Sequence, residues 1–366
     1  MKGTLLTFGE VMGRFEPDPP QLRFPQSVPG ILRCTFAGAE ANVAASYSML
    51  GGDVRYVTAL PQGPLPDAFI KQMKGLDVDV SHIIRTDIGR MGIFFLESGS
   101  GQRPSKVWYD RAYSSIAMLG PESYDWKSIF DGISQLHISG ITPAISESAA
   151  RTSMEIVKQA KQLGVSVSID LNFRKKLWNW RAGTPAKVLA REVVGDMLQY
   201  ADIVIGNEED AADILGITAG ESDINAGKLD IDKYPDVARQ ISRRYSNVTH
   251  VACTLRESIS ANHNNWGAML WEKHSDKAFF APIWENNYTP YKITDIVDRV
   301  GGGDSFAASL LYALQNDEFM GSLQTCISFA VAASCLCHTI RGDFNYTTKE
   351  EVISLMNGNT SGRVNR

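Results

Sequence analysis

The sequence predicts an α/β fold with a largely parallel central sheet, helices on both faces and a small β-sheet lid. Short apolar runs alternate with helical patterns through most of the 366 residues. These runs are almost continuously apolar, which is typical of parallel strands covered on both faces. Two β-rich segments, residues 11–34 and 92–111, interrupt the alternation and predict the lid.

The alternating elements are clearest between residues 137 and 255. The expected strands are residues 137–141, 165–171, 203–206 and 250–255, and the expected helices are 146–163, 185–200, 210–215 and 236–245. Gly164 ends the first of these helices, because glycine tolerates the left-handed conformation that closes a helix. This order of elements predicts parallel strands joined by crossover helices.

The two interrupting segments have a different composition. Residues 11–34 contain five prolines and no helical period, and residues 92–111 contain strands at 93–97 and 106–109 joined by a turn rich in Gly and Ser. Paired as one sheet, such segments could close over the strand ends and exclude water. We therefore expect a core of residues 1–10, 35–91 and 112–366 and a discontinuous lid of residues 11–34 and 92–111.

Composition excludes several classes of protein. Apolar residues make up 44% of the chain, which is enough for a sizeable core, and the net charge of −5 comes from 36 basic and 41 acidic residues. This mildly acidic balance provides no excess of positive charge that would indicate binding to nucleic acid or to an anionic membrane. The apolar runs are too short for a signal peptide or a membrane span. Five scattered cysteines indicate buried thiols in a reducing cytoplasm.

The candidate catalytic motif is the stretch from Asp298 to Asp304. Residues 294–300 predict a strand and the run after Asp304 predicts a helix, so three glycines lie on a strand-to-helix turn. They are Gly301, Gly302 and Gly303. Glycine lets an anion approach the backbone, and the amides at a helix start are unpaired. Asp304 beside this turn could accept the proton of an attacking hydroxyl; the alternative is an ordinary capping acid at a tight turn.

The same motif carries a resemblance to a known family. Asp298–Asp304 resembles the signature Asp-Thr-x-Gly-Ala-Gly-Asp of the ribokinase-like (PfkB) carbohydrate kinases, and residues 37–44 resemble that family's other signature, a glycine pair followed by an Asn-bearing helix. The resemblance covers nearly the whole chain and is nearest to the 2-keto-3-deoxygluconate kinases. Their further motifs are matched by Gly38–Asn42, Tyr109–Arg111, Asn172–Arg174 with Leu177–Trp178, and Gly342–Asp343.

The resemblance implies a ribokinase-like fold and an ATP-dependent transfer to the terminal hydroxyl of 2-keto-3-deoxygluconate, with Mg²⁺ carried in on ATP. The implied catalytic residues are Asp304 as general base, Gly301, Gly302, Gly303 and Arg174. The implied sugar-binding residues are Gly38, Ala39, Asn42, Tyr109, Arg111, Arg174 and Asp304. The implied nucleotide-binding residues are Asn172, Arg174, Asn207, Asp210, Thr254, Arg256, Gly301 and Gly303. No residue is expected to hold a resident metal.

Several of these residues have a structural alternative. A sugar acid calls for a cationic fork, which Arg111 or Arg174 could supply, but the first could also be a solvated lid residue and the second a surface salt bridge. Asn42 is either a ligand donor or a satisfied core amide, and we favour the ligand. Glu40 is more consistent with a structural role. We expect Trp108 to be a packing residue, although it could also form a wall of the sugar pocket. The six histidines show no convergent pattern.

Four positions depart from the family pattern. Asp210 stands where Glu is usual, Arg256 and Gly302 where Gly and Ala are usual, and Arg299 where Thr is usual. Arg299 leaves open whether a monovalent cation binds beside Asp298, as in some relatives.

Two other functions remain open from the sequence. One is the same chemistry on fructose, ribose or a nucleoside, and the other is a non-catalytic sugar sensor. The partners expected are a sugar acid, ATP and a second copy of the chain, paired through the lid, without nucleic acid or membrane.

Overall fold

The computed structural model describes residues 3–218 and 231–359 and has a nine-stranded central sheet. Its order is β14-β13-β12-β11-β10-β9-β1-β4, with β17 paired to β13. The bounds are β1 Thr4–Phe8, β4 Val54–Val57, β9 Ile133–Ser139, β10 Ser166–Asp170, β11 Ile203–Gly206, β12 His250–Ser258, β13 Asn264–Glu272, β14 Lys277–Ala281 and β17 Tyr291–Ile293. Neighbouring strands pair in parallel along β4, β1, β9, β10, β11 and β12, while β13, β14 and β17 pair antiparallel at one edge. The predicted fold class is confirmed.

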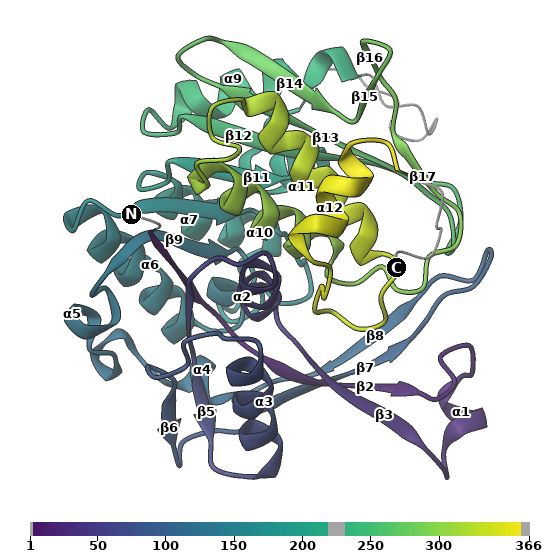
Figure 1. Ribbon diagram of the computed structural model, residues 1–366. Helices are drawn as coiled ribbons and strands as arrows, with labels where there is room; N and C mark the ends of the chain where they lie inside the picture. Colours follow the sequence, from purple (N-terminus) through teal and green to yellow (C-terminus); the bar gives the residue numbers. More distant parts are fainter. Residues whose placement is uncertain (1–2, 219–230, 360–366) are drawn as a thin grey trace.

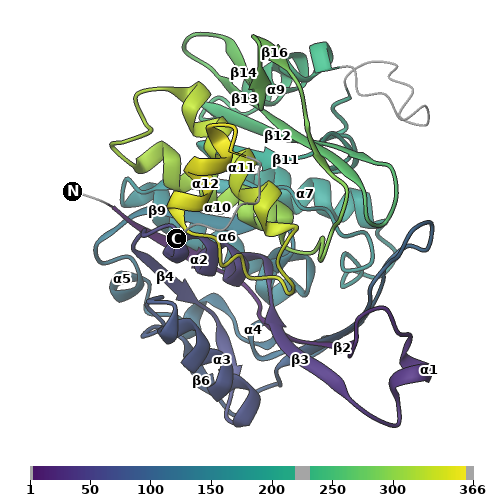
Figure 2. The same cartoon turned by 45° about the vertical axis from the view of Figure 1, so that its right-hand side comes forward.

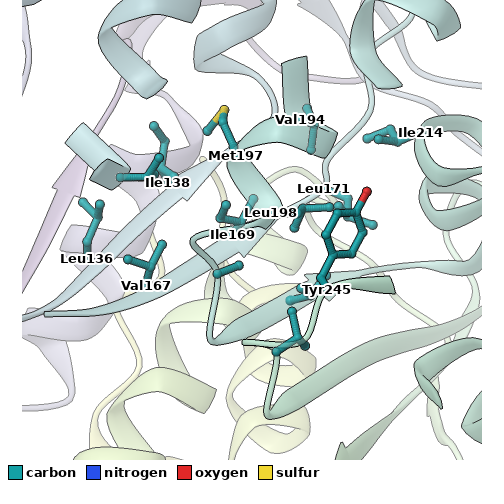
Figure 3. Packing of buried hydrophobic residues seen from close by; sticks show 14 of the residues in the cluster. Leu136, Ile138, Val167, Ile169, Leu171, Val194, Met197, Leu198, Ile214 and Tyr245 are labelled. Atoms are coloured by element: carbon teal, nitrogen blue, oxygen red, sulfur yellow. The ribbon is translucent and has the colours of Figure 1, made fainter. Parts of the chain in front are cut away.

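Helices cover both faces of this sheet (Figure 1). One face carries α2 Ala39–Met49, α3 Pro64–Gly75, α10 Gly302–Gln315, α11 Leu323–Cys337 and α12 Lys349–Met356, and the other carries α4 Ser115–Met118, α5 Trp126–Ile129, α6 Glu147–Gln162, α7 Ala186–Leu198 and α9 Tyr234–Arg244. Neighbouring residues of one strand enter opposite cores, as Leu5 and Leu6 do. This two-sided burial explains why the strands are apolar at nearly every position. Figure 3 shows side chains of β9 and β10 beside Val194, Met197 and Leu198 of α7.

Local signals place the helix ends. Ser146 caps α6, its hydroxyl accepting from the Ala149 amide at 2.9 Å, and Gly164 follows the helix with φ 72°. Thr348 and Glu351 form a reciprocal capping box at the start of α12. None of the helices in the described part of the chain is long and apolar enough to cross a bilayer.

A separate four-stranded sheet projects from the body, as Figures 1 and 2 show. Its order is β3-β2-β7-β8, with bounds β2 Met12–Pro17, β3 Leu32–Ala37, β7 Gly92–Glu97 and β8 Lys106–Asp110, and the short helix α1 Phe24–Ser27 lies between β2 and β3. Its inner face is apolar, built from Met12, Ala37, Phe94 and Leu96. Trp108 packs against Phe24, with ring centroids 6.2 Å apart, and is 47% exposed. Trp108 is not among the cavity-lining residues, so the expectation that it could wall the pocket is wrong.

Two other expectations differ from the structure. The strand predicted at 294–300 is wrong, because β17 ends at Ile293 and the chain is irregular until α10 begins at Gly302. The Asp298 carboxylate accepts from the Val300 amide at 3.1 Å, which turns the backbone and prevents an extended ladder. The cysteines are all free, but the expectation that they are buried is wrong for two of them, because Cys34 on β3 is exposed and Cys335 is only partly buried.

The remaining elements are short. Two-stranded sheets join β5 Ala59–Pro61 to β6 Ile84–Thr86 and β15 Ile283–Trp284 to β16 Asn287–Tyr288. Helix α8 Glu208–Asp210 continues into a wide turn at Ala211–Leu215, near the predicted helix 210–215. Single 3₁₀ turns lie at Pro121–Ser123, Thr142–Ala144 and Ile231–Lys233.

Candidate active site

One cavity of about 960 Å³ lies at the carboxyl edge of the parallel strands. Glu10 follows β1, Asn172 follows β10 and Asn207 follows β11, and all three line it. Parallel strands bring their carboxyl ends to one edge, where open α/β sheets bind ligands. The volume is at the upper end of the range for ligand pockets, so two substrates can meet in it. The cavity brings together Gly38, Ala39, Asn42, Tyr109, Arg111, Asn172, Arg174, Asn207, Asp210, Thr254, Arg256, Gly301, Gly302, Gly303 and Asp304.

The glycine turn opens directly into this cavity. Gly301 caps helix α10 with φ 85°, and a Cβ there would lie 2.3 Å from the Asp343 carbonyl oxygen. No other residue therefore fits at position 301 without moving the backbone. A Cβ on Gly303 would meet nothing within 4 Å, so space is open above the first turn of α10. Unpaired amides and the helix dipole favour an anion in that space, which suits a phosphate group.

Asp304 lies at the third position of α10 and is held by Asn42 of α2. The Asn42 Nδ2 donates to the Asp304 Oδ2 at 2.7 Å, and the Gly38 amide donates to the Asn42 Oδ1 at 3.3 Å. Burial raises the pKa of Asp304 to about 6, although Asn42 and Arg174 both favour the ionised form. A carboxylate with this pKa can accept a proton at neutral pH. Asn42 is thus paired with the candidate base on one side and with its own helix start on the other.

Arg174 reaches the cavity from the segment after β10. Its one hydrogen bond among the described residues is from Nη1 to the neighbouring Phe173 carbonyl at 3.2 Å, and no described carboxylate forms an ion pair with it. The alternative of a surface salt bridge is therefore wrong for the described chain. Burial raises the pKa of Asp170, Asp210 and Asp304, and the positive charge of Arg174 opposes this rise at each of them. The guanidinium is thus available to an anionic ligand among three carboxylates.

Asn207 and Asp210 form a turn that supports this segment. The Asp210 amide donates to the Asn207 Oδ1 at 2.8 Å, and the Phe173 amide donates to the Asp210 Oδ1 at 2.9 Å. Asp210 is therefore part of the helix start and of the support for Arg174 at once. Asn172 has φ 34°, and its buried Oδ1 has no hydrogen-bond partner within the described chain. This orphaned oxygen beside the nucleotide-side residues fits a polar ligand.

Arg111 is buried at the other end of the cavity, where Glu10 pairs with its Nη2. It is 8% exposed, so the alternative of a solvated lid residue is wrong. Its guanidinium lies 5.3 Å from the centre of the Tyr109 ring, and its Nε has no partner within the described chain. Sequence reasoning missed Glu10, because nothing near position 10 indicates a partner that lies 101 residues away.

Glu40 has a structural role, at the start of α2. Its Oε1 accepts from the Ser139 amide at 2.9 Å, the Ser139 hydroxyl at 2.8 Å and the Thr142 hydroxyl at 3.1 Å. Burial raises the pKa of Glu40 to about 7. These bonds fix α2, and with it Asn42, against the end of β9.

Sequence reasoning also missed other residues of the cavity wall, among them an aromatic pair. His338 and Trp266 both line the cavity, with ring centroids 4.9 Å apart. The His338 Nδ1 lies 2.8 Å from the Ser334 carbonyl, and burial lowers the pKa of the ring. They come from β13 and the end of α11, so no local pattern in the sequence links them. His137, by contrast, is buried in β9 as a packed residue.

Arg299 does not face the carboxylate of Asp298. Its Nη2 donates to the carbonyls of Ser260 at 3.0 Å and Ala261 at 2.8 Å. Asp298 is instead bound by the guanidinium of Arg14 and by two backbone amides. A monovalent cation at Asp298 would have to compete with Arg14.

Comparison with known proteins decides the family. The pattern of the pfkB family carbohydrate kinases matches residues 2–234 and 284–348, and the match includes both signatures and the helix of Asp304. The chain belongs to this family of carbohydrate kinases. It is an ATP-dependent sugar kinase with a ribokinase-like fold.

Three individual relatives show which kinds of sugar kinase resemble this chain. The crystal structure of a 2-dehydro-3-deoxygluconokinase from Thermotoga maritima is similar at 40% identity and a TM-score of 0.86, covering 97% of this chain and 100% of that one. A 2-dehydro-3-deoxygalactonokinase of Haloferax volcanii is 28% identical over 99% of both chains. A probable fructokinase-3 of Arabidopsis thaliana is 24% identical over 93% of this chain and 87% of that one.

Proposed function

We propose that this kinase phosphorylates the terminal hydroxyl of 2-keto-3-deoxygluconate, with Asp304 as general base. The observation that carries the proposal is the arrangement around Asp304. Asn42 holds its carboxylate at 2.7 Å, and the glycine turn and Arg174 line the same cavity. The Thermotoga and Haloferax relatives named above act, by their names, on 2-keto-3-deoxy sugar acids, which supports this class of substrate.

Each residue has a defined task in this proposal. Bound with Mg²⁺, ATP supplies the γ-phosphoryl group, and Asn207, Asp210, Thr254 and Arg256 would line its phosphates and nucleoside. Asp304 takes the proton of the sugar hydroxyl as its oxygen attacks phosphorus and the bond to ADP breaks. The amides of Gly301 to Gly303 and the guanidinium of Arg174 stabilise the charge on the transferring group.

The buried Arg111 supports an acidic substrate. Glu10 engages only its Nη2, and the fork of an arginine has further donors for a carboxylate. The free Oε1 of Glu10 could accept from a sugar hydroxyl in the same pocket. A neutral sugar would leave those arginine donors unsatisfied, which disfavours fructose or ribose.

A phosphorylation screen tests the substrate. We expect ADP production with 2-keto-3-deoxygluconate, and the 2-keto-3-deoxygalactonate epimer belongs in the panel because of the Haloferax relative. Removing the buried ion pair as Glu10→Gln with Arg111→Met should raise KM for the acid about 10- to 100-fold, because charge-assisted hydrogen bonds contribute roughly 1.5–3 kcal/mol. Arg90→Met, which breaks an exposed pair with Asp110, is the matched control.

The outcomes separate the candidates. Turnover of fructose or ribose alone, unaffected by loss of Arg111, would point to a neutral-sugar kinase. Thermal stabilisation by a sugar without ADP release would indicate a sensor.

We further propose that residues 11–34 and 92–111 act as a lid and pair the chain with a second copy in the cytoplasm. Strand β8 forms one edge of the lid sheet and exposes 47% of Trp108, which does not line the cavity. Exposed strand edges and aromatic patches favour pairing with another chain. Free thiols at all five cysteines support a reducing compartment. Sedimentation velocity should give a dimer that Trp108→Glu converts to monomer, whereas a monomeric parent would contradict the pairing.

A further inference from the structure

Arg14 is a fully buried arginine at the joint between the lid sheet and the body. It lies on β2, where every residue but Phe15 is buried, and it is 0% exposed. Its Nη1 donates to the Asp343 Oδ1 at 2.6 Å, and its Nη2 donates to the Glu16 Oε2 at 2.7 Å and to the Asp298 Oδ2. One guanidinium therefore bridges three carboxylates from three separate parts of the chain.

Two of these carboxylates flank the glycine turn. Asp298 accepts from the Val300 amide at 3.1 Å just before the turn, and from the Gly342 amide at 3.2 Å on the adjacent segment. The carbonyl of Asp343 packs so closely on Gly301 that only a glycine fits there. The position of the turn thus depends on how the segments of Asp298 and Asp343 are held together.

We propose that Arg14 is a positioning residue for phosphoryl transfer, which fixes the glycine turn by clamping Asp298 to Asp343 and ties that turn to lid strand β2. The inference rests on the proposed function, because the turn matters only if its amides meet the transferring group. Arg14 itself does not line the cavity, whereas Asp343 and the turn do. Its effect must therefore pass through these neighbours.

The charges explain why the clamp needs an arginine. Arg341 adds a second cation, but among the described carboxylates it pairs with Glu16 at 2.9 Å and Asp18 at 3.2 Å, and with neither Asp298 nor Asp343. Without Arg14, Asp298 and Asp343 would repel each other in a buried site. Burial raises the pKa of Asp343 to about 7, and Arg14 opposes that rise and so favours the ionised carboxylate. A planar fork can bind two carboxylates at once, whereas a lysine is a single point charge.

The test compares Arg14→Gln and Arg14→Lys with the parent enzyme, well below their melting temperatures. We expect kcat to fall about 100-fold for Arg14→Gln and about 10-fold for Arg14→Lys, with KM for ATP and for the sugar within threefold, because misplaced donors weaken the transition state more than the ground state. Arg55→Gln is the control for general destabilisation. Arg55 is paired with Asp79 at 2.7 Å, and neither residue lines the cavity. Its kcat should stay near that of the parent.

A folded Arg14→Gln protein with kcat within threefold of the parent would overturn the inference. If Arg14→Gln does not fold, Arg14→Lys decides: parental kcat overturns the clamp, and a lower kcat at unchanged KM supports it. Parent turnover is measured first with the sugar panel. A parent that phosphorylates no sugar counts against the proposed function, while an active parent with an equally active variant counts against Arg14 alone.

Discussion

Replacing Asp304 by Asn should lower kcat about 10³- to 10⁴-fold while both substrates still bind, because the variant keeps the shape of the site but loses the proton acceptor. The amide can still accept a hydrogen bond from Asn42, so the contact between α2 and α10 survives. Burial raises the pKa of Asp304, which means that the folded protein disfavours its charge. Removing that charge should therefore not lower the melting temperature. A coupled ADP assay and isothermal titration measure the two effects.

The pH dependence checks the same carboxyl. Only the ionised form can act as base, and its pKa of about 6 places the loss of activity on the acid side. Accordingly kcat/KM of the parent should rise from pH 5 to 7 and level off above. Asp295→Asn, an exposed carboxylate on the preceding loop, should keep the parental profile. Near-parental turnover by Asp304→Asn would contradict the assignment of Asp304 as the general base.

Contiguous motifs explain how far the site could be predicted from the sequence. The glycines and Asp304 are neighbours along the chain, and a helix start places their amides and carboxylate together by local geometry alone. Asn42 and Arg174 could be placed because both follow recognisable starts or ends of core elements. The strands were predicted for a similar reason, since burial on both faces makes them apolar throughout.

Pairings across the chain account for what the sequence did not reveal. Arg14 and Asp343 are 329 positions apart, and no periodicity connects them. Residues 294–300 contain Ile296 and Val297, which suggest a strand, but the hydrogen bond from Val300 to the carboxylate of Asp298 turns the backbone there. Local propensity favoured an extended segment, and the tertiary ion network overrode it.

Loss of the positive charge of Arg174 should lower kcat nearly as much as loss of the base Asp304. Arg174→Ala is expected to lower kcat about 10³-fold, because a cation on the transferring phosphoryl group contributes at least that factor in related chemistry. Arg174 also lowers the pKa of Asp304, so its loss should move the acid limb of the pH profile to higher pH. Lys175→Ala, an exposed cationic neighbour outside the cavity wall, should change neither quantity.

The effects of Arg174→Ala on kcat and on KM separate two roles for Arg174. A guanidinium that acts on the transition state lowers kcat with little change in KM, whereas one that holds the sugar carboxylate raises KM of the acid and leaves the maximal rate intact. Its place beside the candidate base favours the first role, because the charge of Arg174 acts on Asp304 and the phosphoryl group is transferred to the hydroxyl that Asp304 deprotonates. The buried Arg111 is better placed for the substrate carboxylate, because its one carboxylate partner engages a single nitrogen. A rise in KM alone for Arg174→Ala would reverse the two assignments.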